Sequence, residues 1–112
     1  MQPITDLNAL TIDHSRTTQL YWDTQDPDNE GWALRYWTVD GVQHSVDLDD
    51  DEEASIERLA YQVRREVGPD LILRAPWRIE VHGRGGHRLG SITINPSKGR
   101  VSLRSELGWE RA

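Results

Sequence analysis

Apolar and polar residues alternate along three stretches in the first half of the chain, at residues 17–23, 31–39 and 42–48. A period of two residues is typical of strands that bury one face. The turn-rich segment TQDPDNE joins the first two stretches, and an Asp-Gly pair joins the second to the third. The pattern therefore predicts a three-stranded meander.

A helical period follows the acidic run at residues 47–53. The apolar residues recur at spacings of three and four, as expected for one helix face, and they are Ile56, Leu59, Ala60, Val63 and Val67. Acids before this stretch and arginines near its end suit the helix macrodipole, and Gly68-Pro69 supplies a stop. We therefore expect one amphipathic helix at about residues 50–67, with Asp49 as its N-cap.

The last third of the chain again alternates between apolar and polar residues. Residues 77–82 and 87–94 flank a glycine-rich turn, and a change of phase near Gly90 predicts a bulge in the second stretch. A last strand is expected at residues 100–104. These three strands are expected to join the meander in one larger sheet.

The elements together predict a single α+β domain spanning residues 1–112. Its sheet is expected to be antiparallel, with about five to six strands in the chain order βββ-α-βββ, and the amphipathic helix packs on one face. Two segments fit no single pattern: residues 1–16 suit a short helix or a first strand, and residues 71–74 are short and apolar. The chain has no cysteine, which excludes disulfides, thiolate catalysis and cysteine metal sites.

The composition indicates the compartment of the protein and the class of partner that it binds. No stretch approaches the roughly 20 apolar residues that span a bilayer, and the first residues lack the pattern of a secretory signal. We therefore expect a cytoplasmic protein. The net charge of −6 argues against general binding of nucleic acid. The sequence contains no recognisable set of metal ligands and no cofactor motif, so we expect neither a metal nor a cofactor.

Charge is segregated along the chain. Residues 1–56 contain 13 acids and two arginines, whereas residues 57–112 contain 11 basic residues and six acids. Helix capping uses one or two acids, yet six fall within seven residues here. We therefore interpret the run as an acidic ridge that binds a basic surface of a protein partner, although a solvated helix start also explains it. The partner-binding residues predicted here are Asp47, Asp49, Asp50, Asp51, Glu52 and Glu53.

The glycine-rich turn suggests an alternative function. Backbone amides in such a turn can face an anion, and nearby arginines and histidine add positive charge. Arginines of the neighbouring strands would extend this surface toward phosphate or nucleic acid, while a plain hairpin turn and a solvated sheet face explain the same residues. The anion-binding residues of this alternative are Arg84, Gly85, Gly86, His87, Arg88, Arg78, Arg100 and Arg104.

No catalytic constellation can be assembled from the sequence. Asp13-His14-Ser15 and His44-Ser45 place suitable residue types side by side, but neighbours on a strand point to opposite faces. We therefore predict a small acidic protein-binding domain without enzyme activity, of the kind found in immunity-type proteins, inhibitors or phage-encoded antagonists. A second alternative is a structural subunit that forms oligomers through an exposed face containing Trp22, Trp37 or Trp109.

Overall fold

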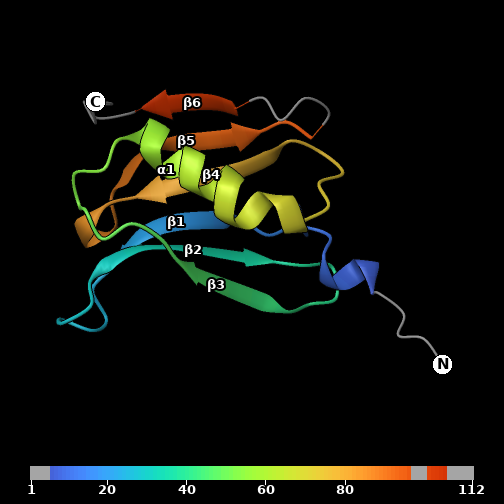
Figure 1. Ribbon diagram of the computed structural model, residues 1–112, viewed down its shortest axis with the longest axis horizontal. Helices are drawn as coiled ribbons and strands as arrows, with labels where there is room; N and C mark the ends of the chain where they lie inside the picture. Colours follow the sequence, from blue (N-terminus) through green and yellow to red (C-terminus); the bar gives the residue numbers. More distant parts are fainter. Residues whose placement is uncertain (1–5, 97–100, 106–112) are drawn as a thin grey trace.

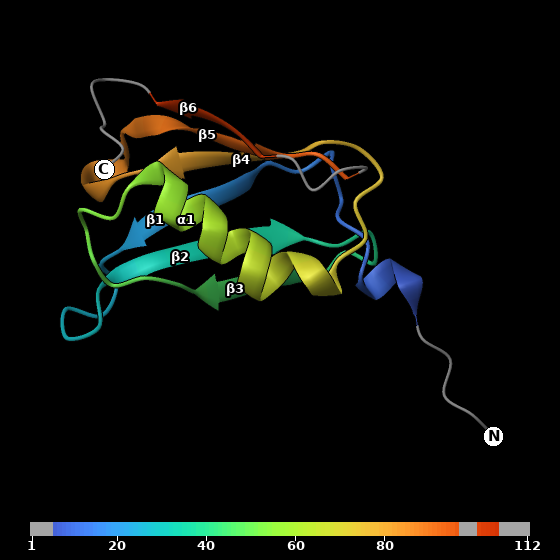
Figure 2. The same cartoon turned by 45° about the horizontal axis from the view of Figure 1, so that its top comes forward.

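The fold is known from a computed structural model, which describes residues 6–96 and the backbone of residues 101–105. Within these residues, six strands form one mixed sheet in the order β3-β2-β1-β4-β5-β6, and α1 lies across one face (Figures 1 and 2). The strands are β1 (Thr18–Asp23), β2 (Gly31–Trp37), β3 (Gln43–Asp47), β4 (Trp77–His82), β5 (Arg88–Ile94) and β6 (Val101–Ser105). The helical segments are η1 (Leu7–Ala9), α1 (Ile56–Gln62), η2 (Val63–Val67), η3 (Gly68–Asp70) and η4 (Arg84–Gly86).

The α+β class, the single amphipathic helix and the mostly antiparallel sheet are confirmed. The prediction of an entirely antiparallel sheet is wrong at the centre, where β1 and β4 are parallel and Thr18 pairs with Ile79. The helical segment carries the chain from the end of β3 back along the sheet (Figure 1). Strand β4 therefore begins at the same end as β1 and runs in the same direction.

The core lies between the helix and one face of the sheet. All five residues of the predicted helix stripe are buried, and they pack on buried strand residues that include Leu34, Trp77 and Ile79. The indole Nε1 of Trp77 donates a hydrogen bond of 2.9 Å to the hydroxyl of Thr18, so its one polar group is satisfied in the core. The predicted bulge is also present, since Leu89 is skipped where β5 pairs with the end of β4.

The two ambiguous segments meet at one end of the sheet. Residues 7–9 form a single helical turn, and Thr11 and Ile12 then form isolated bridges to Ile72 and Thr38. Residues 1–16 thus include a short helical turn and a bridged extended stretch, both of which were considered in the prediction. Residues 71–74 supply a bridge partner, Ile72, without forming a strand. No helix within the described ranges has the length and apolar character needed to cross a membrane.

The helix begins later than predicted. Its N-cap is Ser55, whose hydroxyl accepts the amide of Arg58 at 3.2 Å, and not Asp49. The preceding segment forms local turns instead, because the carboxylates of Asp49 and Asp51 accept the amides two residues further along. Such bonds compete with helical hydrogen bonds. At its other end the helix widens into η2, which ends at Val67 as predicted, and the short η3 turn follows at the predicted stop, Gly68-Pro69.

We expect Ser55→Ala to lower the free energy of unfolding by about 1 kcal/mol, because it removes the acceptor for a free amide in the first turn. Chemical denaturation of both proteins measures the difference. Asp50→Asn is the control, because Asp50 is exposed and lies outside the helix. Equal stability of Ser55→Ala and the unchanged protein would show that the cap bond contributes nothing.

Candidate functional site

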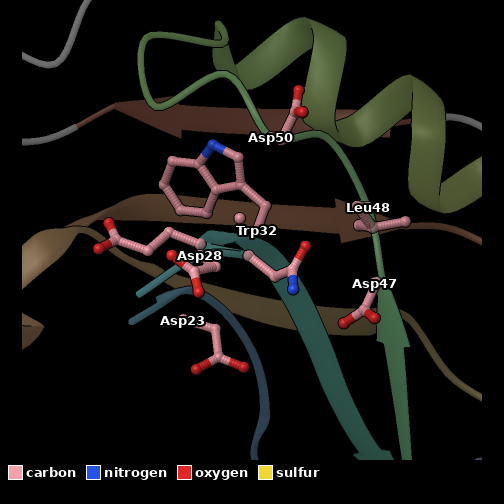
Figure 3. A pocket seen from close by; sticks show the side chains of 9 residues that line it. Asp23, Asp28, Trp32, Asp47, Leu48 and Asp50 are labelled. Carbon is pink, nitrogen blue, oxygen red and sulfur yellow. The ribbon is translucent and has the colours of Figure 1, made fainter. Parts of the chain in front are cut away.

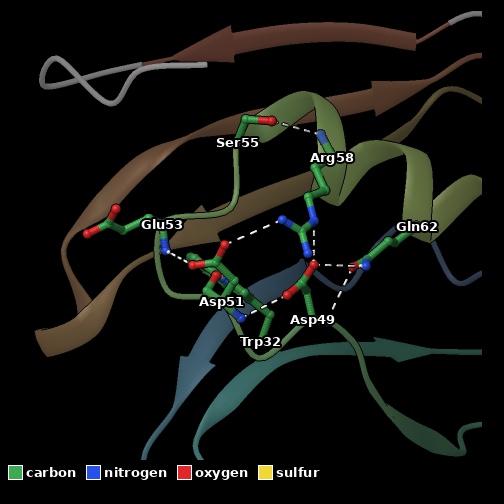
Figure 4. Close-up of polar contacts among 7 residues, drawn as sticks. All are labelled: Trp32, Asp49, Asp51, Glu53, Ser55, Arg58 and Gln62. Atoms are coloured by element: carbon green, nitrogen blue, oxygen red, sulfur yellow. Dashed lines mark hydrogen bonds and ion pairs between the residues drawn. The ribbon is translucent and has the colours of Figure 1, made fainter. Parts of the chain in front are cut away.

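Asp49 and Asp51 hold the segment before α1 against the helix and the core (Figure 4). The side chain of Asp49 is only 4% exposed, and its Oδ2 atom lies 2.6 Å from Nε of Arg58 and accepts a hydrogen bond from Gln62. The carboxylate of Asp51 lies 3.4 Å from Nη1 of the same arginine. Its backbone carbonyl accepts the indole N–H of Trp32 at 2.9 Å. Two of the six predicted partner-binding acids thus have internal contacts.

Glu52 belongs to a second cluster, centred on Arg84. The guanidinium of Arg84 donates to Glu52 at 3.0 and 3.1 Å and to Glu30 at 2.6 Å, and it lies 5.7 Å from the ring centre of Trp22. Hydrogen bonds from Arg84 and then from the indole of Trp22 lower the pKa of Glu30, and the two carboxylates raise the pKa of Arg84. Glu30 and Arg84 therefore stay charged at neutral pH, and their ion pair ties the β4–β5 turn to the β1–β2 hairpin.

The remaining predicted acids, Asp47, Asp50 and Glu53, are exposed and form no ion pair within the described part of the chain. Asp47 and Asp50 line a hollow of about 260 Å³ at one end of the sheet (Figure 3). Asp23 and Asp28 of the β1–β2 hairpin line the same hollow. We call these four residues the acidic hollow.

The sheet topology creates this hollow. Strand β2 pairs antiparallel with both β1 and β3, so the β1–β2 connection lies beside the segment that leaves β3. That segment passes directly beside Gly31, since a Cβ atom at this position would be in van der Waals contact with the carbonyl oxygen of Asp49 at 3.4 Å. The other lining residues are Asn29, Glu30, Gly31, Trp32 and Leu48.

The acidic hollow concentrates negative charge without an internal counterion. None of its four carboxylates pairs with a cation in the ranges that the structure describes, whereas Glu30 on the same rim is neutralised by Arg84. Within those ranges, no group of three or more histidine or acidic side chains has the geometry to hold a metal ion. The four acidic residues instead line an open hollow, and like charges gathered at one end of the sheet attract cationic groups from solution.

The glycine-rich turn has the geometry of a hairpin loop. Gly85 and Gly86 both have φ of 85°, which favours glycine, and the amide of Gly83 donates to the carbonyl of His87 across the turn. The guanidinium of Arg84 is directed to the two glutamates of its cluster. The main cation of the proposed anion site thus already has carboxylate partners.

The arginines of the alternative surface are only partly described. Arg78 is exposed on β4, and Arg88 lies 3.6 Å from Glu80, which is two residues from Arg78 on the same strand. Arg104 pairs with Ser91 in the register of β6, but its side chain lies outside the described part of the chain, as does Arg100 entirely. The described residues thus bring Arg78 and Arg88 to one face, with a carboxylate between them.

The tryptophans proposed for an oligomer face differ in exposure. Trp22 is buried, and Trp37 is half-buried with the guanidinium of Arg16 5.4 Å from its ring centre. Trp109 lies outside the described residues. The large apolar side chains that are exposed in the described part do not include a tryptophan; they are Leu7, Val39, Val42 and Tyr61.

Comparison of the chain with protein-family models, curated proteins and solved structures found no match. Function is therefore inferred from geometry alone. Asp47 and Asp50 were among the predicted partner-binding residues, whereas Asp23 was predicted only as the end of a strand and Asp28 only as part of a turn. The predicted meander contained the signal that could have found them, because antiparallel pairing brings the first hairpin loop beside the end of the third strand.

Proposed function

We propose that this chain is a non-enzymatic protein-binding domain that engages a basic surface of its partner through the acidic hollow. The observation that carries the proposal is that four acidic residues line one hollow, with no cation paired to their carboxylates among the described residues. Mutual repulsion makes such an arrangement costly in the free protein. A partner that supplies lysine or arginine side chains relieves this repulsion.

The mode of action that fits this surface is stoichiometric association, as in immunity-type proteins, inhibitors or phage-encoded antagonists. Charge concentrated on one end of a small domain steers an opposite surface before contact forms, so association is expected to be fast and sensitive to salt. The contacts of Arg84 with two glutamates do not favour the alternative of phosphate or nucleic-acid binding at the glycine-rich turn.

The test uses a variant in which Asp23, Asp28, Asp47 and Asp50 are all changed to Asn. The partner is first isolated from the native cell lysate on the immobilised unchanged protein, and its association is then measured at several salt concentrations. We expect affinity to fall by roughly tenfold or more, mainly through slower association at low salt, and the salt dependence to flatten.

A matched variant carries the same change of net charge elsewhere, with Asp6→Asn, Glu57→Gln, Glu66→Gln and Asp70→Asn. These four acids are exposed and do not line the hollow. It should retain most of the affinity. An equal loss in both variants would mean that net charge alone governs association, and an unchanged affinity of the first variant would exclude the hollow as the interface.

A further inference from the structure

The face of the sheet opposite α1 is covered by no other element within the described residues (Figures 1 and 2). Its outer strand β3 exposes Gln43, Ser45 and Asp47, and β4 exposes Arg78. At the centre, the cross-strand pairs place Gln19, Arg35 and Ser45 in one row on neighbouring strands. Arg35, in the middle of this row, therefore places a positive charge on the uncovered face.

Arg35 is half-buried and held in one orientation by its neighbours. Its Nη2 atom donates to the side-chain oxygen of Gln19 at 2.8 Å, and its guanidinium carbon lies 4.9 Å from the ring centre of Tyr21. Stacking on an aromatic ring and a hydrogen bond donated to a neighbouring strand together fix the plane of a guanidinium. The side chain is thus preorganised before any ligand arrives.

Arg35 nevertheless lacks the partners that a half-buried cation normally has. In the described part of the chain it makes no ion pair, and its Nε atom is buried without a hydrogen-bond acceptor. The arginines at 16, 58, 84 and 88 each lie near a carboxylate, and the other described arginines, at 64, 65, 74 and 78, form no ion pair but are exposed to water. A charge withdrawn from water without a counterion is unfavourable, and unsatisfied buried donors are rare.

We propose that Arg35 is a recognition site for one carboxylate, namely an aspartate or glutamate side chain of a protein that lies on the uncovered sheet face. Such a side chain supplies the missing countercharge and an additional acceptor for the guanidinium. This proposal is based on the contacts of Arg35 and is independent of the function proposed for the acidic hollow.

A single carboxylate fits this face better than a polyanion. Glu80 lies beside Gln19 on the next strand, and Asp47 lies beside Ala33 at the outer strand, so acids flank Arg35 on two sides. A nucleic-acid backbone would bring its repeated phosphates against these carboxylates, and it gains affinity from several cations at once. A single carboxylate needs only the one cation, Arg35, and brings no further negative charge onto this face.

Titration followed by ¹⁵N NMR tests the proposal on the unchanged protein. The probe is glutamate blocked at both backbone ends, added at constant ionic strength, and blocked glutamine is the neutral control. We expect the Arg35 Nε–Hε signal and the amide of Tyr21 to shift and to saturate at millimolar probe. The glutamine analogue should cause no saturating shift. Arg78 serves as an internal control, because it is an exposed arginine of the same face.

Three outcomes would overturn the proposal: equal shifts at Arg35 and Arg78, equal shifts with the two probes, or saturation by inorganic phosphate at lower concentration than by blocked glutamate. Arg35→Lys keeps the charge but removes the planar donor group, and it should abolish the saturating shift at Tyr21. The titration of the unchanged protein decides the question even if that variant does not fold. Binding to the acidic hollow has a separate readout, so the two proposals can fail independently.

Discussion

Leu59→Asp is expected to abolish most of the stability of the fold. Leu59 is fully buried at the centre of the helix stripe that faces the sheet. The substitution removes a large apolar contact and places a carboxylate where the core offers no partner, so we expect a loss of about 4 kcal/mol or more. Domains of this size are typically stable by roughly 5–15 kcal/mol, so a loss of this size removes most of the stability of a protein near the lower end of that range.

Circular dichroism during thermal and chemical denaturation measures this effect. Tyr61→Asp is the matched control, since it introduces the same side chain two residues away on the exposed side of the helix, where Tyr61 is 59% exposed. We expect the control to change stability by less than about 1 kcal/mol. A Leu59→Asp protein that melts like the control would show that the helix packs through a different face.

The helix and the strands could be predicted because each has its own period. The stripe that contains Leu59 repeats at the helical spacing, and every member of it is buried. The bulge at Leu89 could be predicted for the same reason, because an inserted residue shifts the alternation that follows it. Local patterns of this kind report which residues face the core, and the sequence displays them directly.

The start of the helix and the parallel strand pair at the centre of the sheet could not be predicted from periodicity. They depend on competing hydrogen bonds and on the path of the chain after the helix. Acids before a helix suit its dipole, yet the same side chains can bind amides two residues away, and here Asp49 and Asp51 do so. The position of β4 beside β1 depends on where the chain lands after the helix. The acids before the helix are compatible with either helix start, and the sequence of β4 is compatible with either neighbour in the sheet.

The acidic hollow could be predicted only in part, because its residues come from separate segments. Asp47 and Asp50 stand out within a run of acids, whereas Asp23 ends strand β1 and Asp28 belongs to an ordinary turn. The run also concealed different environments: Asp49 is buried, and Asp50 next to it is exposed. Neighbouring positions in the sequence therefore suggested one continuous acidic surface, and they did not indicate the residues from the first hairpin that complete the hollow. Arg35 was not identified, since its lack of a counterion is visible only in three dimensions.

Asp49→Ala is expected to be the most damaging change within the acidic run. The nearly buried carboxylate accepts hydrogen bonds from Gln62 and from the amide of Asp51, and it pairs with Arg58. Removal leaves these donors without their acceptor at the junction of the loop, the helix and β2. Breaking a buried ion pair costs about 3–5 kcal/mol, but Arg58 is 53% exposed and can be solvated, so we expect about 2 kcal/mol.

Asp50→Ala tests whether this effect belongs to the hydrogen bonds and ion pair of Asp49 or to the removal of one negative charge. Asp50 is the adjacent acid, it is exposed, and its side chain has no ion pair in the described residues. Its replacement should change the free energy of unfolding by less than about 0.5 kcal/mol, because an exposed carboxylate contributes little to stability and its removal relieves repulsion among neighbouring acids. Urea denaturation of the two variants gives the comparison. Equal stability of both would mean that Asp49 is as dispensable as a solvated acid, and that the segment before α1 is held by the hydrogen bonds of Trp32 and Ser55 instead.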